Sequence, residues 1–456
     1  MNSVPNARLR IVVDDMLYIS KFPSTDHADE ISSGVDFTRR RSCCRVIHAW
    51  LTSVHLCLGF VKSINLSFPF PPCATPSAMK SVVLPLMPTE LSNVHSPSIS
   101  TLTFFNTTAP VSDTNQSRTF LQSRVDAIVQ VNPWLSGQIQ TSAHGGSRLV
   151  LRYDANTSSL PVEIISMPAL SPSLEYEAVA GMLSSLEAPQ GSDVVDVVHA
   201  ALFRVYWITI SSSQSALFVS MAHGLGDGYT YYRIYGMLSA DARVEALLPD
   251  RVDDFQRVRA AAISDIDNVL SMLGRAARQE STKDERSRRT LHTIDPAWIA
   301  NEKAKASRMV STNDILTSWF FRQTKADIGV MVVNLRGRAE GLEPHMAGNY
   351  QTVVAYQPED FATPGLIRES VRHGMRRACS KELPHDVRTV SLTTSWASLY
   401  KQVVLPAWKM AEHWPITNGR SMFSNGAVIF QRTPDSIGVL MRTKHDVAKQ
   451  STLFLP

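Results

Sequence analysis

The sequence has few cysteines, little excess charge and no long apolar run. Its 456 residues include five cysteines, which form neither a C-x-x-C pair nor an even set, so neither a disulfide framework nor a structural zinc site is expected. The formal net charge is only +4, and nothing in the charge distribution indicates a nucleic-acid partner. What remains is an ordinary globular composition, with 44% hydrophobic residues, in a chain long enough for two domains or two lobes.

Residues 1–78 differ from the rest of the chain. They hold four of the five cysteines, a basic cluster and a proline-rich exit at 68–72. The apolar segment 46–61 follows the basic cluster, which allows a signal-anchor interpretation, but this segment is shorter and more polar than a typical membrane span. We therefore interpret 1–78 as an extension that is either disordered or lies upstream of a true start at Met79. The expected location is cytoplasmic, with an N-terminal membrane anchor as the alternative.

From Met79 onward, strand-like and helix-like segments alternate in both halves of the chain. This order favours an α/β protein with mixed sheets covered by helices. We assign 79–250 to an N-terminal lobe, 251–290 to a crossover helix and linker, and 291–456 to a C-terminal lobe. Strands are expected at 81–84, 98–105, 137–141, 147–152, 162–166, 202–210, 215–223, 290–294, 328–335, 351–356, 427–431 and 437–442. Helices are expected at 120–129, 174–186, 229–238, 255–273, 296–307, 315–322, 364–380 and 395–404.

The segment 222–228 reads Ala-His-Gly-Leu-Gly-Asp-Gly and lies between a predicted strand and a predicted helix. His223 and Asp227 form an H-x-x-x-D-G pattern, which chance would produce only about 0.03 times in such a chain. Gly224, Gly226 and Gly228 are expected to adopt φ values that other residues resist. Because a strand end holds a side chain more rigidly than a free loop, His223 is a candidate base. The alternative is a core histidine beside an unrelated aspartate.

Three further segments accompany this motif in a fixed order. Residues 132–137 resemble a P-x-L-x-G helix exit, 311–319 resemble an S-x-N-D-x-L helix start, and 333–338 with 348–350 resemble an R-x-R…G-N segment. Over about 81–426 the chain is similar to the acyltransferase superfamily of chloramphenicol acetyltransferase, plant BAHD acyltransferases and the condensation domains of nonribosomal peptide synthetases. The resemblance implies two chloramphenicol acetyltransferase-like lobes with the active site in a tunnel at their interface.

The resemblance also implies a reaction and a set of roles. The reaction is acyl transfer from a thioester such as acyl-CoA to a hydroxyl or amine of a small-molecule acceptor. His223 would be the general base, and Asp227 would hold the loop in shape by pairing with Arg336. The candidate substrate-binding residues are Gly228, Asn349, Asn418 and Ser421, and the last two are also the candidate oxyanion donors. No metal and no bound cofactor are expected, acyl-CoA is the co-substrate, and the protein is expected to be a monomer.

One departure from the family leaves alternatives open. The DFGWG block of BAHD enzymes is absent, and Gly419 stands where related acyltransferases carry a tryptophan. This argues against a plant-like BAHD subtype and leaves the acceptor open. The alternatives are a free-standing condensation domain that uses carrier-bound acyl groups, a non-catalytic binding protein of the same fold, and a membrane-bound lipid acyltransferase. A basic edge at Arg286, Arg288 and Arg289 is expected to be a solvated surface or, alternatively, a phosphate attractor.

Overall fold

The computed structural model describes most of the chain after Met79. The described residues are 80–108, 114–142, 148–190, 193–197, 200–263, 265–281, 287–372, 384, 387–418, 423–448 and 451–455. The predictions for 1–78 and its apolar segment lie outside these residues. Within them, no helix has the length and the hydropathy needed to cross a membrane.

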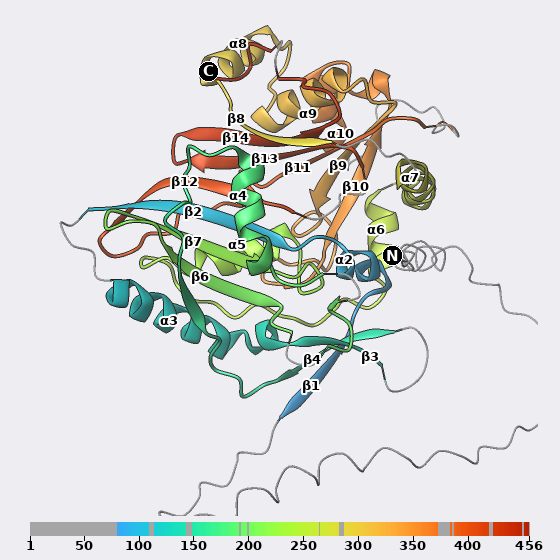
Figure 1. The fold of residues 1–456 in the computed structure, drawn as a ribbon. Coiled ribbons are helices and arrows are strands. Elements are labelled where there is room, and N and C mark those ends of the chain that lie inside the picture. Colours follow the sequence, from blue (N-terminus) through green and yellow to red (C-terminus); the bar gives the residue numbers. More distant parts are fainter. Residues whose placement is uncertain are drawn as a thin grey trace, which may run out of the picture. The chain divides into compact units, whose positions relative to one another are not determined.

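A five-stranded sheet carries the motif that contains His223 (Figure 1). Its strands pair antiparallel, except for β5 with β6. In order across the sheet they are β12 (Trp408–Ile416), β2 (Ile99–Thr107), β7 (Gln214–Met221), β6 (Phe203–Thr209) and β5 (Val162–Ser166).

The central strand β7 shows why this part of the sequence is apolar without alternation. Leu217 and Val219 belong to a core with helices α3 (Thr114–Val131) and α5 (Gly228–Gly236). Ala216 and Phe218 face the opposite core, which includes α4 (Tyr176–Leu183). Since successive side chains of a strand point to opposite faces, burial of both faces requires a continuous apolar run.

A six-stranded sheet forms most of the second half of the chain. Its parallel pairs are β9 with β11 and β11 with β13, and the remaining pairs are antiparallel. In order across the sheet the strands are β10 (Gln351–Tyr356), β9 (Ile328–Asn334), β11 (Val390–Ser395), β13 (Asn425–Thr433), β14 (Ser436–Thr443) and β8 (Arg288–Thr293). Figure 1 shows helices α8 (Pro296–Lys305), α9 (Thr312–Gln323) and α10 (Pro364–Arg372) on one side of this sheet.

The helix starts in this half follow from the sequence. Asp295 caps α8 by accepting from the backbone N–H of Ala297, and Pro296 occupies the first helical position. The predicted capping box of α9 is present, because Ser311 and Asp314 each accept from the other's backbone N–H. Helices α6 (Phe255–Ala262) and α7 (Ile266–Ser281) follow α5 in the chain and precede β8. The sequence predicted one longer helix and a linker in this stretch.

A smaller antiparallel sheet joins β1 (Ser81–Pro85), β4 (Leu149–Asp154) and β3 (Gln138–Thr141). After β1 the chain forms a 3₁₀ turn, η2 (Pro88–Glu90), and the short helix α2 (Leu91–Val94). A second 3₁₀ turn, η3 (Pro133–Ser136), lies where the sequence predicts that Asn132-Pro133 ends a helix. Strand β3 and helix α2 pack beside the loop that follows β7, because a Cβ added to Gly224 would lie 2.4 Å from the Ile139 side chain and 3.2 Å from that of Val94.

Two strands of the second half were not predicted, and one predicted helix is wrong. The segment expected as a helix at 395–404 makes only one turn, with Leu399 and Tyr400 donating to the carbonyl of Trp396. The chain then extends, because Val404 donates to the Ser239 side chain and its carbonyl accepts from Ala240. The unpredicted strands β11 and β12 lie on either side of this segment.

Strand β12 joins the two halves of the chain. It comes from the C-terminal segment of the chain but pairs with β2 in the sheet of the N-terminal segment, over eight residue pairs with one bulge. The N-terminal sheet is therefore completed by a strand from the other half of the sequence.

Candidate active site

The H-x-x-x-D-G segment lies where the two large sheets meet. Strand β7 ends at Met221, and His223 follows within two residues. Asp227 caps α5 by accepting from the backbone N–H of Thr230. The other side of the site is the connection between β9 and β10, which carries Arg336 at its start and Gly348-Asn349-Tyr350 at its end. Two stretches more than a hundred residues apart thus form one cluster.

The glycines of the motif serve close packing, and the prediction that they need unusual φ values is wrong. The described glycines with positive φ are Gly337, Gly341 and Gly348, and none of them belongs to the motif. A Cβ added to Gly224 would lie 2.4 Å from the Ile139 side chain, and one on Gly226 would lie 2.7 Å from Thr230. Small residues are needed here because neighbouring side chains occupy the space that a Cβ would fill.

Asp227 and Arg336 form a buried ion pair, at 2.8 Å between Oδ2 and Nη1. The same carboxylate accepts from the backbone N–H groups of Thr230 and Tyr350, both at 3.0 Å. No hydrogen bond joins Asp227 to the imidazole of His223 within the described residues. The carboxylate is therefore committed to the loop and to Arg336, and it acts on His223 only through space.

The guanidinium of Arg336 is fully engaged in this cluster. Besides Asp227, it donates to the Asn334 side chain, to Thr230 Oγ1 and to the carbonyls of Met346 and Gly348, at 2.8–3.0 Å. It also lies over the rings of Tyr229 and Tyr350, 4.7 and 4.9 Å from their centroids. A buried charge is stable only when its partners compensate for lost hydration, and here every N–H of the side chain has an acceptor.

His223 is partly buried, and its two ring nitrogens differ. Nδ1 lies 3.0 Å from Oδ1 of Asn349. Nε2 makes no hydrogen bond in the part of the chain that the structure describes. Burial lowers the pKa of His223 below its usual value, while its own carbonyl, Asp227, Asn349 and Glu90 act in the opposite direction. The imidazole is therefore neutral at neutral pH, with one nitrogen unused.

A second buried ion pair, which the sequence did not reveal, lies behind Asn349. Glu90 Oε2 is 2.9 Å from Arg251 Nε, and both side chains are almost fully buried. Glu90 Oε1 accepts from the backbone N–H of Asn349 at 3.1 Å and from its Nδ2 at 3.2 Å. The Asn349 side chain, proposed from the sequence as a substrate ligand, thus contacts His223 and Glu90.

The other predicted substrate residues are spread more widely. Gly228 is the first residue of α5, and a Cβ there would lie 3.3 Å from Trp396 Nε1. Asn418 follows the end of β12, and its amide lowers the pKa of Glu187, although burial has the larger effect and raises that pKa to about 7. No contact of the described residues joins Asn418 to His223. Ser421 lies outside the described residues.

Arg288 and Arg289, the described part of the basic edge, have protein partners. Arg288 forms an ion pair with Glu175 at 3.3 Å, and Arg289 pairs with Glu177 and donates to the Thr417 carbonyl. These contacts fasten β8 to α4 and to the end of β12. The basic edge is therefore used, at these two positions, for internal ion pairs.

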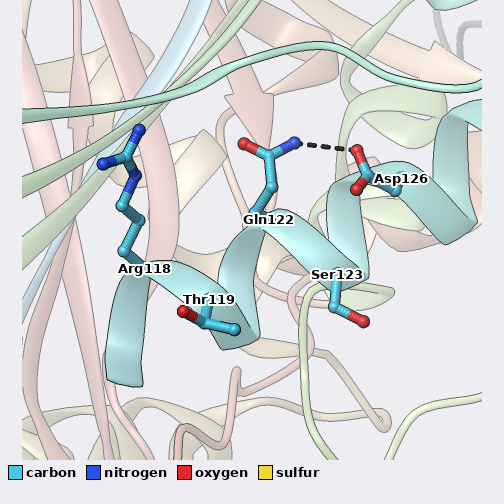
Figure 2. A pocket seen from close by; sticks show the side chains of 5 residues that line it. All are labelled: Arg118, Thr119, Gln122, Ser123 and Asp126. Atoms are coloured by element: carbon cyan, nitrogen blue, oxygen red, sulfur yellow. Dashed lines mark hydrogen bonds between the residues drawn. The ribbon is translucent and has the colours of Figure 1, made fainter. Parts of the chain in front are cut away.

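A hollow on the surface lies on helix α3, lined by Arg118, Thr119, Gln122, Ser123 and Asp126 (Figure 2). Gln122 is not free in this hollow, because its amide nitrogen Nε2 donates to Asp126 Oδ1 at 2.8 Å. None of these residues belongs to the cluster around His223. Within the described residues, no three His, Cys, Asp or Glu side chains are placed to hold a metal ion.

The comparisons with known proteins place this geometry in a structural class. Neither a protein-family model nor a curated protein sequence matches the chain. Solved structures do match. Vinorine synthase superposes with a TM-score of 0.57 at 16% identity, over 82% of this chain and 92% of that one. TRI101 of F. sporotrichioides, solved with coenzyme A and T-2, superposes with a TM-score of 0.52 at 14% identity, over 79% and 95%.

A third similar structure is the condensation domain of the monacolin K polyketide synthase MokA, with a TM-score of 0.52 at 13% identity, over 82% and 94%. At these identities the likeness shows the fold alone. That fold is the two-lobed, mixed α/β fold of BAHD acyltransferases and condensation domains, as the sequence predicted. The chain therefore has an acyltransferase fold.

Sequence reasoning missed three residues of the cluster. Thr230 bonds Asp227, Arg336 and Gly348. Only its backbone bond to Asp227 could have been expected, because an aspartate before a helix accepts from the backbone N–H three residues on. Glu90 and Arg251 carry no such signal. Glu90 is 259 positions before Asn349, and only the packing of η2 against the β9–β10 connection brings them together.

Proposed function

We propose that this protein transfers an acyl group from acyl-CoA to a hydroxyl or amine of a small-molecule acceptor, with His223 as the general base. The observation that carries the proposal is the state of His223. It is a partly buried imidazole at the end of a central strand, with Nε2 free of hydrogen bonds in the described residues, in a chain with an acyltransferase fold.

The proposed reaction needs no covalent enzyme intermediate. Nε2 of His223 removes the proton from the acceptor O–H or N–H as that atom attacks the thioester carbonyl. The tetrahedral intermediate then collapses, the C–S bond breaks, and the imidazolium returns the proton to the departing CoA thiolate. An imidazole suits both steps, because its ordinary pKa of about 6.5 lets it accept and release a proton near neutral pH.

Asp227 and Arg336 hold the loop and do not touch the reacting atoms in this proposal. Their ion pair joins the start of α5 to the connection between β9 and β10. It therefore keeps His223 at a fixed position relative to both sheets. Asn418 and Ser421 stay candidates for the oxyanion donor or the acceptor site.

A direct assay tests the proposal. The purified protein is incubated with a panel of acyl-CoAs, with and without a metabolite extract, and thiol release is followed. We expect extract-dependent thiol release that disappears in His223→Ala. Thiol release that His223→Ala leaves unchanged would contradict the assignment of the base, and no release with any acyl-CoA would favour one of the two alternatives below.

A condensation-type reaction with a carrier-bound acyl group is the second candidate. The similarity to the MokA condensation domain supports it, since that domain superposes over most of both chains. Donors on CoA and on a pantetheinylated carrier protein, compared side by side, separate the two reactions. A non-catalytic binding protein of this fold would show neither transfer nor slow, His223-dependent hydrolysis of the thioester.

A further inference from the structure

The hydrogen bonds of Asn349 determine the orientation of its amide. Nδ2 faces the carbonyl oxygen of His223 at 2.9 Å and the Glu90 carboxylate at 3.2 Å. Both of these groups are acceptors only, so the atom that faces them must be the donor nitrogen. A flipped amide would place an oxygen against a carboxylate and a carbonyl. Oδ1 is therefore the atom that faces His223 Nδ1.

This orientation also determines the tautomer of His223. Oδ1 of Asn349 is an acceptor, and it lies 3.0 Å from Nδ1 of the ring. Nδ1 must therefore carry the proton, which leaves the lone pair of the neutral ring on Nε2. With the opposite tautomer, the acceptor Oδ1 would face a nitrogen lone pair, and Nε2 could not accept a proton.

Glu90 strengthens this arrangement from behind. Its carboxylate accepts from both the backbone N–H and Nδ2 of Asn349, which polarises the amide and makes Oδ1 a better acceptor. Nε of Arg251 lies 2.9 Å from Oε2 of Glu90 and compensates the buried charge of this carboxylate. The backbone N–H of Met87 donates to the same Oε2. Gly348 makes the approach possible, since a Cβ there would lie 2.9 Å from the Arg251 guanidinium.

We propose that Asn349, Glu90 and Arg251 are a positioning relay that holds His223 in the Nδ1–H tautomer and directs Nε2 to the acceptor. This relay deepens the proposed function and rests on it for its effect on activity, whereas the tautomer itself is a property of the resting protein. Asn349 touches His223, and Glu90 and Arg251 act through Asn349. None of the three is a catalytic residue.

The tautomer is measured first, without substrate. Protein with ¹⁵N-labelled histidine gives ring nitrogen shifts that distinguish Nδ1–H from Nε2–H, and the His223 signal is assigned by its loss in His223→Ala. We expect Nδ1–H in the native protein and a change to Nε2–H, or to a mixture, in Asn349→Leu. An Nε2–H ring in the native protein, or an unchanged ring in folded Asn349→Leu, would overturn the proposal.

A matched control separates positioning from folding. Asn132 is also fully buried and makes three side-chain hydrogen bonds, donating to the carbonyls of Ile128 and Glu245 and accepting from Leu247. Asn132→Leu should lower thermal stability but leave the His223 tautomer and the pH profile as they are. Asn349→Leu should lower kcat about 10- to 100-fold with little change in KM. An equal effect of both variants on the tautomer and the pH profile would reduce Asn349 to a structural residue.

Glu90→Gln tests the relay with a smaller change, in case Asn349→Leu does not fold. The charged groups near His223 are Asp227 on its own loop, Glu90 on η2, Arg251 before α6 and Arg336 after β9. Loss of the Glu90 charge should move the acid limb of the kcat profile to lower pH, because a weaker acceptor at Asn349 makes the ring less basic. Asp314→Asn, which removes a buried carboxylate paired with the partly exposed Arg368, is the control and should not move it.

The double variant Glu90→Gln with Asn349→Asp tests the order of the relay. It moves the carboxylate one step closer to His223 while keeping an acceptor for Nδ1–H. We expect the Nδ1–H tautomer and an acid limb at higher pH than in Glu90→Gln alone. If the acid limb of the double variant lies at the same pH as that of Glu90→Gln, the proposed polarisation of the Asn349 amide by Glu90 is overturned. A native protein that has the Nδ1–H tautomer but transfers no acyl group would instead count against the proposed function.

Discussion

The partly buried His223 and the fully buried His413 have opposite surroundings. His223 has one ring nitrogen bonded, to Asn349, and the other free in the described residues. His413 on β12 is fully buried with both nitrogens bonded, Nδ1 to Thr103 at 2.8 Å and Nε2 to Tyr232 at 3.0 Å. The same side chain is thus available for chemistry in one region and fully used for structure in the other.

The charge around the two histidines differs in the same way. His223 lies beside two buried ion pairs, Asp227–Arg336 and Glu90–Arg251. His413 lies among hydroxyls and aromatic rings, with Tyr235 and Tyr400 at centroid distances of 5.3 and 4.7 Å. Burial lowers the pKa of His413 to about 3. Buried charge and an unused nitrogen, rather than burial alone, distinguish the candidate site.

The largest expected effect comes from the ion pair beside His223. Asp227→Asn leaves the Arg336 guanidinium buried without a counter-charge, which should cost about 3–5 kcal/mol of unfolding free energy. Urea unfolding and soluble yield measure it, and activity should fall as well. A fully stable but inactive variant would instead give Asp227 a direct chemical role. Asp314→Asn shows the cost of removing a buried carboxylate whose arginine partner is partly exposed, away from His223.

His223→Ala should lower turnover by about 10²-fold or more, near 2.7 kcal/mol, if the free nitrogen is the base. Its thermal stability should stay close to that of the native protein, since only Asn349 loses a side-chain partner. The native protein should then lose acyl-transfer activity as the pH falls below about 6.5, because the lowered pKa of His223 places its protonation there. Near-normal acyl transfer by the variant would remove the distinction between the two histidines.

His413→Leu should do the reverse and lower stability by about 2 kcal/mol, because Tyr232 loses its buried partner. Turnover at a temperature where the variant is folded should change little. The native protein should also lose stability as the pH falls from about 6.5 towards 3, since the unfolded histidine takes up a proton that the folded one refuses. The slope of stability against pH should be smaller in His413→Leu than in the native protein. An equal slope would show that other groups cause the loss of stability in acid.

Glu187 gives the smallest effect and a pH dependence of opposite sign. Burial raises its pKa to about 7, so the folded carboxyl keeps its proton above the pH at which the unfolded one loses it. Stability should therefore fall as the pH rises from about 4.5 to 7. Glu187→Gln should flatten this decline and stabilise the protein at pH 8 by on the order of 1 kcal/mol, measured by urea unfolding at pH 5 and pH 8. A steeper decline of stability with pH in Glu187→Gln would contradict the assignment of this pH dependence to Glu187.

Most elements could be read from local patterns. The strands β5 and β10 and the capped start of α9 lie where apolar runs and capping residues predict them. The segment after Ser395 could not be read in this way. Its apolar residues Trp396, Leu399, Tyr400 and Val403 recur at helical spacing and therefore predict a helix that is not formed. That spacing is satisfied by one turn packed on Tyr232 of α5, after which hydrogen bonds to the loop after α5 hold the chain extended.

The sequence by itself determined the chemistry that the site can offer. A histidine and an aspartate in a glycine-rich turn at a strand end identify the candidate base and the residue that braces it, and the contact of Asp227 with Arg336 was expected from the resemblance. Only the tertiary structure decided which nitrogen of His223 is free. That depends on Glu90, Arg251 and Asn349, three residues from distant segments whose contact arises from packing of the two halves of the chain.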